Sequence, residues 1–238
     1  MSASSNAGRL GVWGASGSGK SAFTKRYVKP KRRVVIFDPL DEYGGQSVRD
    51  LDGVRIGMRK SWNKFRVSYV PRPGAETKSL SALCKLLMMA QQPFKDTGQG
   101  DQLTLVVEEM NMAFPVAGGA QKCPGFAEIC SRGRHFGIEV VGVSQRLAEV
   151  DTRFRGNCTE TVVFRQKGPR DKQAAAAELG VRVSDLPAEN LHYLHEKAGK
   201  IERGKITFGR SAAKPKPANT NLPPAANDNS APKRKKRA

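Results

Sequence analysis

Short apolar runs alternate with amphipathic segments over most of this chain of 238 residues. The apolar runs predict buried strands, and segments with apolar residues at helical spacing predict helices. Strands are expected at Arg9–Trp13, Arg33–Phe37, Val67–Val70, 103–107, Ile138–Ser144 and Thr161–Arg165. Helices are expected from Lys20, over Ser79–Gln91, over Phe126–Arg134 and over Asp171–Leu179. An irregular basic region precedes the third strand, and a terminal hairpin around Gly204 is predicted over Ala198–Phe208.

This alternation sets the expected fold class and domain limits. Strands joined by helices form a mostly parallel sheet with helices on both faces, so we predict an α/β fold with one core over residues 9–210. Residues 1–8 are expected to be a flexible N-terminus. From residue 211 the composition shifts to Ala, Pro, Asn and Lys. Because such a segment buries too little apolar surface to offset its ordering entropy, we predict a disordered basic tail over residues 211–238.

The charge of the chain is strongly positive. It holds 41 Lys and Arg against 22 Asp and Glu, a net charge of +19. The tail holds seven basic residues and Asp228, and subtracting its +6 leaves +13 on the predicted domain. This balance favours contact with a polyanion, and nucleic acid is the natural one.

Cysteine spacing and hydropathy indicate the cellular compartment to expect. The four cysteines show neither the C-x-x-C spacing of zinc sites nor a dense disulfide framework, which favours a reducing compartment. The first residues lack a basic region followed by an apolar stretch, and no apolar run approaches the ~18 residues of a membrane span. We therefore expect a protein that is not secreted and has no membrane span.

The segment Gly-Ala-Ser-Gly-Ser-Gly-Lys-Ser matches the Walker A pattern G-x-x-x-x-G-K-[ST]. It follows an apolar strand and opens a helix, where glycines let backbone N–H groups surround phosphate oxygens. Lys20 would contact the β- and γ-phosphates, and the Ser21 hydroxyl would reach Mg²⁺. We therefore predict ATP and Mg²⁺ as cofactors; the alternative is a Gly/Ser-rich turn without a ligand. The predicted nucleotide-binding residues are Gly14, Ala15, Ser16, Gly17, Ser18, Gly19, Lys20 and Ser21.

Two adjacent carboxylates end the strand that begins at Leu103. Neighbouring residues of a strand point to opposite faces, so Glu108 and Glu109 can serve one site only if the strand ends between them. A phosphate-binding loop needs an acid beside Mg²⁺ and a base beside the attacking water. We assign the metal to Glu108, together with Ser21, and the water to Glu109. Solvated carboxylates after a buried strand are the alternative.

A third polar element follows the strand Ile138–Ser144. Gln145 at its tip could touch both the γ-phosphate and the attacking water. The arginines before this strand, Arg132 and Arg134, could stabilise transition-state charge on a neighbouring subunit's phosphate. A solvated or DNA-facing cation is the alternative for either arginine.

Together these motifs resemble the FtsK/HerA superfamily of hexameric DNA-pumping ATPases, whose fold is a RecA/ASCE-like P-loop NTPase. The resemblance rests on the P-loop, on Phe37-Asp38-Pro39 with Asp41-Glu42-Tyr43, on the acidic strand, and on Arg134-x-Phe-Gly-Ile leading to Ser144-Gln145-Arg146. It implies that Gln145 lies between Lys20 and Glu109. It also implies an arginine finger at Arg134, with Arg132 as its rival. The superfamily's usual acidic pair is Asp-Glu, so Glu108-Glu109 departs from the pattern and leaves the register of the first acid less fixed.

The short length is similar to that of the genome-packaging ATPases of membrane-containing, tectivirus-like icosahedral phages. This resemblance implies pumping of double-stranded DNA into a preformed capsid by a homo-oligomeric ring, expected to be a hexamer. Capsid vertex proteins would be partners, and the location would be the host cytoplasm or the packaging vertex. A host or plasmid translocase of the HerA-like or conjugative kind is one alternative. A non-motor module that binds nucleotide and nucleic acid is another, as is a small-substrate P-loop kinase.

A DNA motor grips the phosphate backbone with Lys and Arg. The densest candidates lie in the basic region before and within the third strand, interleaved with Trp62 and Phe65, and a solvated edge hairpin is the alternative. The candidate DNA-binding residues are Arg55, Arg59, Lys60, Lys64 and Arg66. The run from Lys233 to Arg237 could hold DNA near the motor, or act as a nuclear localisation signal in a eukaryotic host. A tail that only aids solubility is the alternative.

Overall fold

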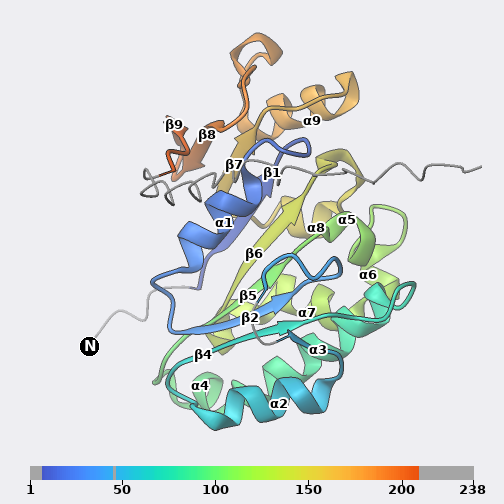
Figure 1. The fold of residues 1–238 in the computed structure, drawn as a ribbon, viewed down its shortest axis with the longest axis vertical. Helices are drawn as coiled ribbons and strands as arrows, with labels where there is room; N and C mark the ends of the chain where they lie inside the picture. The colour runs from blue at the N-terminus through green and yellow to red at the C-terminus, as the bar shows by residue number, and fades with distance from the viewer. Residues whose placement is uncertain (1–6, 45–46, 209–238) are drawn as a thin grey trace, which may run out of the picture. The chain divides into compact units, whose positions relative to one another are not determined.

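A nine-stranded sheet organises the described residues, 7–44 and 47–208, of the computed structural model (Figure 1). The order across the sheet is β3-β4-β2-β5-β6-β1-β7-β8-β9. The strands are β1 Arg9–Trp13, β2 Arg33–Phe37, β3 Ser47–Val48, β4 Phe65–Tyr69, β5 Leu103–Val107, β6 Ile138–Ser144, β7 Glu160–Phe164, β8 His192–Lys197 and β9 Lys200–Lys205. Strands β1 to β7 pair in parallel, and only β8 and β9 join antiparallel. The predicted α/β class is confirmed.

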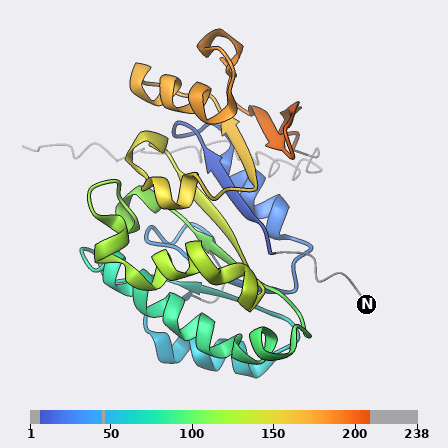
Figure 2. The same cartoon turned by 180° about the vertical axis from the view of Figure 1, so that it is seen from behind.

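Helices cover both faces of the sheet. Helix α1 (Lys20–Val28) lies on the face toward the viewer in Figure 1, whereas α3 (Glu76–Ala90) and α7 (Pro124–Arg132) lie on the opposite face in Figure 2. Each face has its own apolar core, and the larger core lies beneath α3 and α7. The other helices are α2 Leu51–Lys60, α4 Gln92–Thr97, α5 Met110–Ala113, α6 Gly119–Lys122, α8 Thr152–Arg155 and α9 Pro169–Leu179, with 3-10 turns at Gly133–Phe136, Leu147–Glu149 and Val183–Asp185.

The region predicted to be irregular is ordered as β3 and α2. The Asp50 side chain caps α2 by accepting the Gly53 N–H at 2.7 Å. Gly53 and Gly57 lower intrinsic helix propensity, but a Cβ at Gly57 would lie only 2.7 Å from Val67 Cγ2. The glycines therefore allow α2 to lie close to the sheet. The edge-hairpin alternative for this region is wrong.

The terminal hairpin is shifted from its predicted position. Its strands are β8 and β9, and the turn lies at Ala198 and Gly199, where φ is 50° and 76°. Gly204 lies within β9 opposite Tyr193. A Cβ there would lie 2.2 Å from the Tyr193 ring, so this glycine makes room for an aromatic side chain rather than a turn.

Other expectations concern the ends of the chain. The predicted tail, residues 211–238, lies outside the described residues, as does most of the predicted N-terminal segment. Within the described residues, no helix combines the length and apolar composition needed to cross a bilayer.

Helices α3 and α7 approach each other most closely at Gly125. Its N–H donates to Ser81 Oγ at 3.0 Å, and a Cβ at this position would lie 2.2 Å from the Ser81 carbonyl oxygen. The obstructing atom is backbone, so it cannot move without separating the helices.

Gly125→Ala should therefore destabilise the fold by about 1–3 kcal/mol, the usual effect of overpacking a core. Denaturant unfolding would measure the change. Gly180→Ala is a poor comparison because of its positive φ, whereas the difference between Ser131→Ala and Ser131→Gly, at an exposed position of the same helix, reports the effect of propensity alone. An unchanged midpoint for Gly125→Ala would contradict the tight packing.

Candidate nucleotide site

The loop between β1 and α1 has the geometry of a phosphate cradle. Gly17 and Gly19 have φ of 70° and 114°, which favour glycine. The loop is anchored by Ala15, whose N–H donates to the Arg165 carbonyl at 2.8 Å. Among the described residues, the amides of Ser16, Gly17 and Gly19 have no acceptor. These free donors at a helix N-terminus are what an anionic ligand requires.

Lys20 is buried at the start of α1, with only 7% of its surface exposed. Its Nζ donates to the Ala15 carbonyl at 3.1 Å, which holds the ammonium over the loop. Burial lowers the pKa of Lys20, while the charges of Glu109 and Glu108 oppose that shift. Lys20 and the two carboxylates therefore share one electrostatic environment.

Strand β5 ends between the two glutamates. The Glu108 N–H still donates to the Phe37 carbonyl at 3.0 Å, so this residue continues the pairing with β2. Glu109 has a left-handed backbone, with φ of 44°, and precedes α5. The change of backbone direction gives the two carboxylates different partners although they are adjacent in sequence.

Glu109 contacts the residue that follows β6. Gln145 Nε2 donates to Glu109 Oε1 at 2.7 Å. Strand β6 lies between β1 and β5, so the strand order brings Gln145 between the P-loop and the acidic strand. Ser144, just before it, donates from its hydroxyl to Asn111 Oδ1 at 2.8 Å. Two side-chain bonds thus join the end of β6 to the segment after β5.

Glu108 is buried against Tyr43, a residue to which the sequence assigned no role. The Tyr43 hydroxyl donates to Glu108 Oε1 at 2.6 Å. Burial raises the pKa of Glu108 to about 7, an increase that the Tyr43 hydrogen bond opposes and the charge of Glu109 enhances. Buried Asp38 positions this tyrosine, because its carboxylate accepts the Tyr43 N–H at 2.9 Å. The motif after β2 was visible in the sequence, but its contact with Glu108 required the fold.

The oxygen ligands fit a magnesium ion. Ser21 and Glu108 offer a hydroxyl and a carboxylate, the hard ligands that Mg²⁺ prefers, and the Ser21 hydroxyl has no hydrogen bond within the described residues. The described residues contain no cluster of three or more His, Cys, Asp or Glu side chains suited to a metal. A site of this kind suits an ion held mainly by phosphates and water. When bound, Mg²⁺ would neutralise charge on the β- and γ-phosphates.

The predicted finger arginines lie far from this site in their own chain. Both precede β6, so they lie at the amino ends of the parallel strands, while the P-loop lies at the carboxyl ends. Arg132 is paired with Glu128 on the same helix. Arg134 is exposed, and its only side-chain hydrogen bond among the described residues is the 3.5 Å approach of its Nε to His135 Nε2. Either could reach a phosphate only in another subunit.

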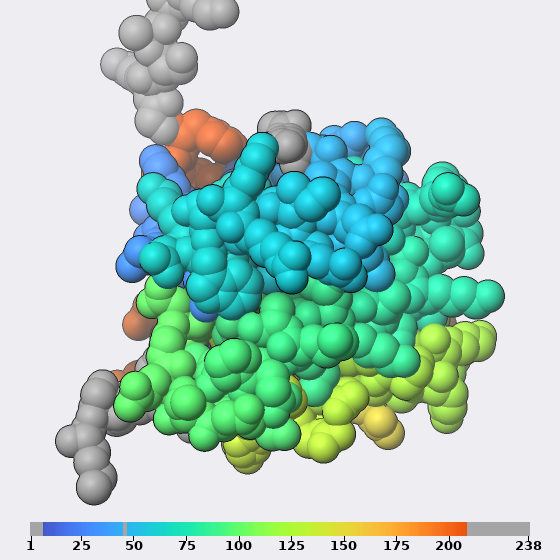
Figure 3. All heavy atoms as spheres, turned by 90° about the horizontal axis from the view of Figure 1, so that it is seen from below, coloured from blue at the N-terminus to red at the C-terminus, as the bar shows by residue number. Residues whose placement is uncertain are grey.

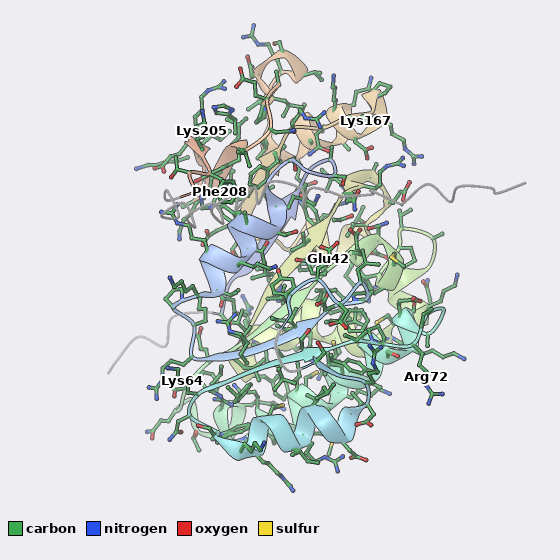
Figure 4. All side chains as sticks on the ribbon, in the orientation of Figure 1. Glu42, Lys64, Arg72, Lys167, Lys205 and Phe208 are labelled. Carbon is green, nitrogen blue, oxygen red and sulfur yellow. The ribbon has the colours of Figure 1, made fainter. Side chains whose placement is uncertain are left out.

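The predicted DNA-binding residues divide between two surfaces. Lys64 and Arg66 contribute to a cavity of about 500 Å³. Its other cations come from the end of α1 and from the turn before β2. The full lining is Lys25, Lys29, Lys31, Arg32, Lys64, Phe65 and Arg66. Arg55 and Arg59 instead line a groove between α2 and α3. Lys60 ends α2 and is exposed. Figure 4 shows Lys64 and Arg72 at opposite ends of β4.

The chain is similar in sequence to a phage protein and in fold to solved viral and bacterial structures. No family model matches the chain. Protein P9 of Pseudoalteromonas phage PM2 is 27% identical over 149 residues, which are 62% of this chain and 63% of that protein. The genome packaging NTPase B204 of Sulfolobus turreted icosahedral virus 2, solved with AMPPCP, superposes with a TM-score of 0.65 at 18% identity, covering 85% of this chain and 98% of B204.

The chain has the P-loop NTPase fold. VirB4 of Thermoanaerobacter pseudethanolicus also superposes, with a TM-score of 0.61 at 13% identity over 85% of this chain and 90% of VirB4. The resemblance to packaging ATPases and their relatives that the motifs indicated is therefore found in the solved structures as well. The matched part of the chain spans less than two thirds, 63%, of the length of the phage relative.

Glu108 generates a testable pH effect on stability. Its pKa is near 7 in the fold and 4.5 ordinarily. The folded chain therefore gains stability from the bound proton below pH 4.5 and loses that gain as the pH rises to 7. Glu108→Gln removes the ionisation penalty while keeping an oxygen for Tyr43. We expect the nucleotide-free variant to be more stable by about 1–3 kcal/mol at pH 8, and by much less at pH 5.

Denaturant unfolding with a chelator present would measure both values. Glu202→Gln, on exposed β9, makes the same chemical change without a burial penalty and should be neutral at both pH values. A Glu108→Gln protein no more stable than the parent at pH 8 would show that the carboxylate is well solvated.

Proposed function

We propose that this protein is an ATPase that moves double-stranded DNA and packages a viral genome. The single observation that carries the proposal is the 2.7 Å contact of Gln145 with Glu109 beside a buried P-loop lysine. A P-loop with a purely structural role has no need of a paired carboxylate and neutral amide near its lysine. The similarity to B204, a genome packaging NTPase, supports the packaging role, and the similarity to a phage protein supports a viral setting.

Each residue at the sheet edge has a proposed part in hydrolysis. Glu109 accepts the proton of the attacking water, whose oxygen bonds to the γ-phosphorus as the bond to the β,γ-bridging oxygen breaks, giving ADP and phosphate. Lys20 and the free loop amides neutralise the phosphate oxygens. Gln145 holds Glu109 in place and changes partner when a γ-phosphate arrives. Ser21 and Glu108 hold the magnesium ion.

The positions of the two arginines before β6 support assembly of several subunits into a ring. Arg134 is our proposed finger, because Arg132 is already paired with Glu128 and Arg134 has no carboxylate partner among the described residues. Its distance from its own P-loop requires that a neighbouring subunit complete each site. We therefore propose a homo-oligomeric ring, with six subunits as in the superfamily that the motifs resemble.

Glu109→Gln should stop turnover while leaving nucleotide bound. Removing a general base lowers the rate by about 10²–10⁴-fold, and the amide can still hydrogen-bond to Gln145. Phosphate release, with and without duplex DNA, would measure hydrolysis, and a fluorescent ATP analogue would measure binding. The parent enzyme should be stimulated by duplex DNA.

Glu202→Gln serves as the control and should hydrolyse ATP at the parent rate. Hydrolysis by Glu109→Gln at that rate would reassign the base. A parent rate that is the same with and without DNA, at all salt and protein concentrations, would argue against a DNA motor.

The basic cavity between α1, β2 and β4 is the proposed DNA contact. Lys29 and Lys64 there have no ion pair within the described residues, so both are available to phosphates. A plot of log affinity for duplex DNA against log salt concentration has a negative slope. Lys64→Ala should make that slope less steep by about 0.9, the value for one lost phosphate contact. Lys200→Ala, on exposed β9, is the matched control. Equal slopes for the two variants would place the DNA elsewhere.

A further inference from the structure

An apolar groove lies between α2 and α3, on a part of the surface that the proposed ATPase does not use. Its volume is about 540 Å³. Met58 and Trp62 line one side, and Leu86 and Met89 line the other. Figure 3 shows the cyan atoms of α2 beside the blue-green atoms of α3 on this face. The groove lies at the β3–β4 end of the sheet, far across the strand order from the P-loop strand β1.

The groove exposes large apolar side chains to water. Met89 is 77% exposed and Trp62 is 40% exposed. Single exposed apolar residues are ordinary, but a concave group of them bounded by polar residues marks an interaction surface. A groove walled by two helices suits a third helix that inserts apolar side chains at i, i+3, i+4 and i+7.

The charges around the groove identify the class of partner. The lining contains three cations and no carboxylate. Arg55 is paired with Asp52 at 3.2 Å, but Arg59 and Lys85, on opposite walls, have no ion pair within the described residues. An acidic side chain on the partner would find an unpaired cation on either wall.

We propose that this groove binds an amphipathic helix of another protein, one that presents apolar residues flanked by Asp or Glu. This chain's own residues 211–238 are a poor fit, because they hold seven basic residues against one acid. Duplex DNA is also a poor fit, since it offers phosphates without apolar side chains, and the basic cavity around Lys64 suits it better. The proposal does not depend on ATP hydrolysis.

The test uses the full-length protein and three synthetic peptides of about 14 residues, the length that spans about 20 Å of helix. The first carries Leu at i, i+3, i+4 and i+7 with Glu flanking them. The second replaces Leu by Gln, and the third replaces Glu by Lys. Labelled-peptide anisotropy gives affinity, and Trp62 fluorescence reports contact because the only other tryptophan, Trp13, is fully buried.

The acidic apolar peptide alone should bind and should change the tryptophan signal. Lys85→Glu and Met89→Glu should each weaken it by at least about tenfold, since one loses a charge partner and the other an apolar wall. Lys78→Glu is the matched control, because it reverses the same charge on the same helix outside the groove. It should change affinity by less than about threefold at physiological salt.

Several results would overturn the proposal. Equal binding of the Gln peptide would show that charge attraction alone, without apolar contact, accounts for binding. Equal binding of the Lys peptide would show that the partner's acidic residues are not recognised. Competition by duplex DNA, or by a peptide of residues 211–238, would assign the groove to that ligand instead. A change of oligomeric state in Met89→Glu would assign it to a second copy of this chain.

Discussion

Parallel pairing of the central strands is the constraint on which the site depends. Because β1, β2, β5 and β6 run the same way, the residues that follow each of them emerge at one edge of the sheet. That edge receives the P-loop after β1, Asp38 after β2, Glu108 after β5 and Gln145 after β6. Placing β6 between β1 and β5 then sets the Gln145–Glu109 contact. An antiparallel strand among them would send one of these groups to the far edge.

Without nucleotide, the edge of the sheet that carries the site has more buried carboxylates than buried cations. Lys20 is the buried cation, while Asp38 and Glu108 are buried carboxylates and Glu109 lies close by. Asp38 is satisfied by backbone and side-chain donors, but within the described residues Glu108 has only the Tyr43 hydroxyl. Buried charge of this kind is unfavourable unless it is paired. The imbalance at Glu108 is therefore suited to a bound cation.

Local sequence was enough to predict the strands and helices that have strong periodicity. The limits of β2 and β6 agree with prediction to the residue, because both are long apolar runs with clear ends. Helix α2 was missed because its two glycines lower helix propensity. Only their tertiary contacts explain them, since Gly53 lies against Val48 and Gly57 against Val67. The P-loop was visible as a motif. The Tyr43–Glu108 bond was not, because it joins residues 65 positions apart in sequence and depends on β2 lying beside β5.

The distribution of positive charge shows why net charge alone could not locate a binding surface. Lys64 and Arg66 belong to a cavity of cations, whereas Arg59, only a few residues earlier, faces an apolar groove. Helix α1 joins the cavity to the nucleotide site, because Lys20 begins it and Lys29 follows its last residue. Nine residues of helix span about 13 Å and bend little over that length. Since α1 is packed on the sheet through Phe23 and Val28, it holds the cationic cavity at a fixed distance from the P-loop.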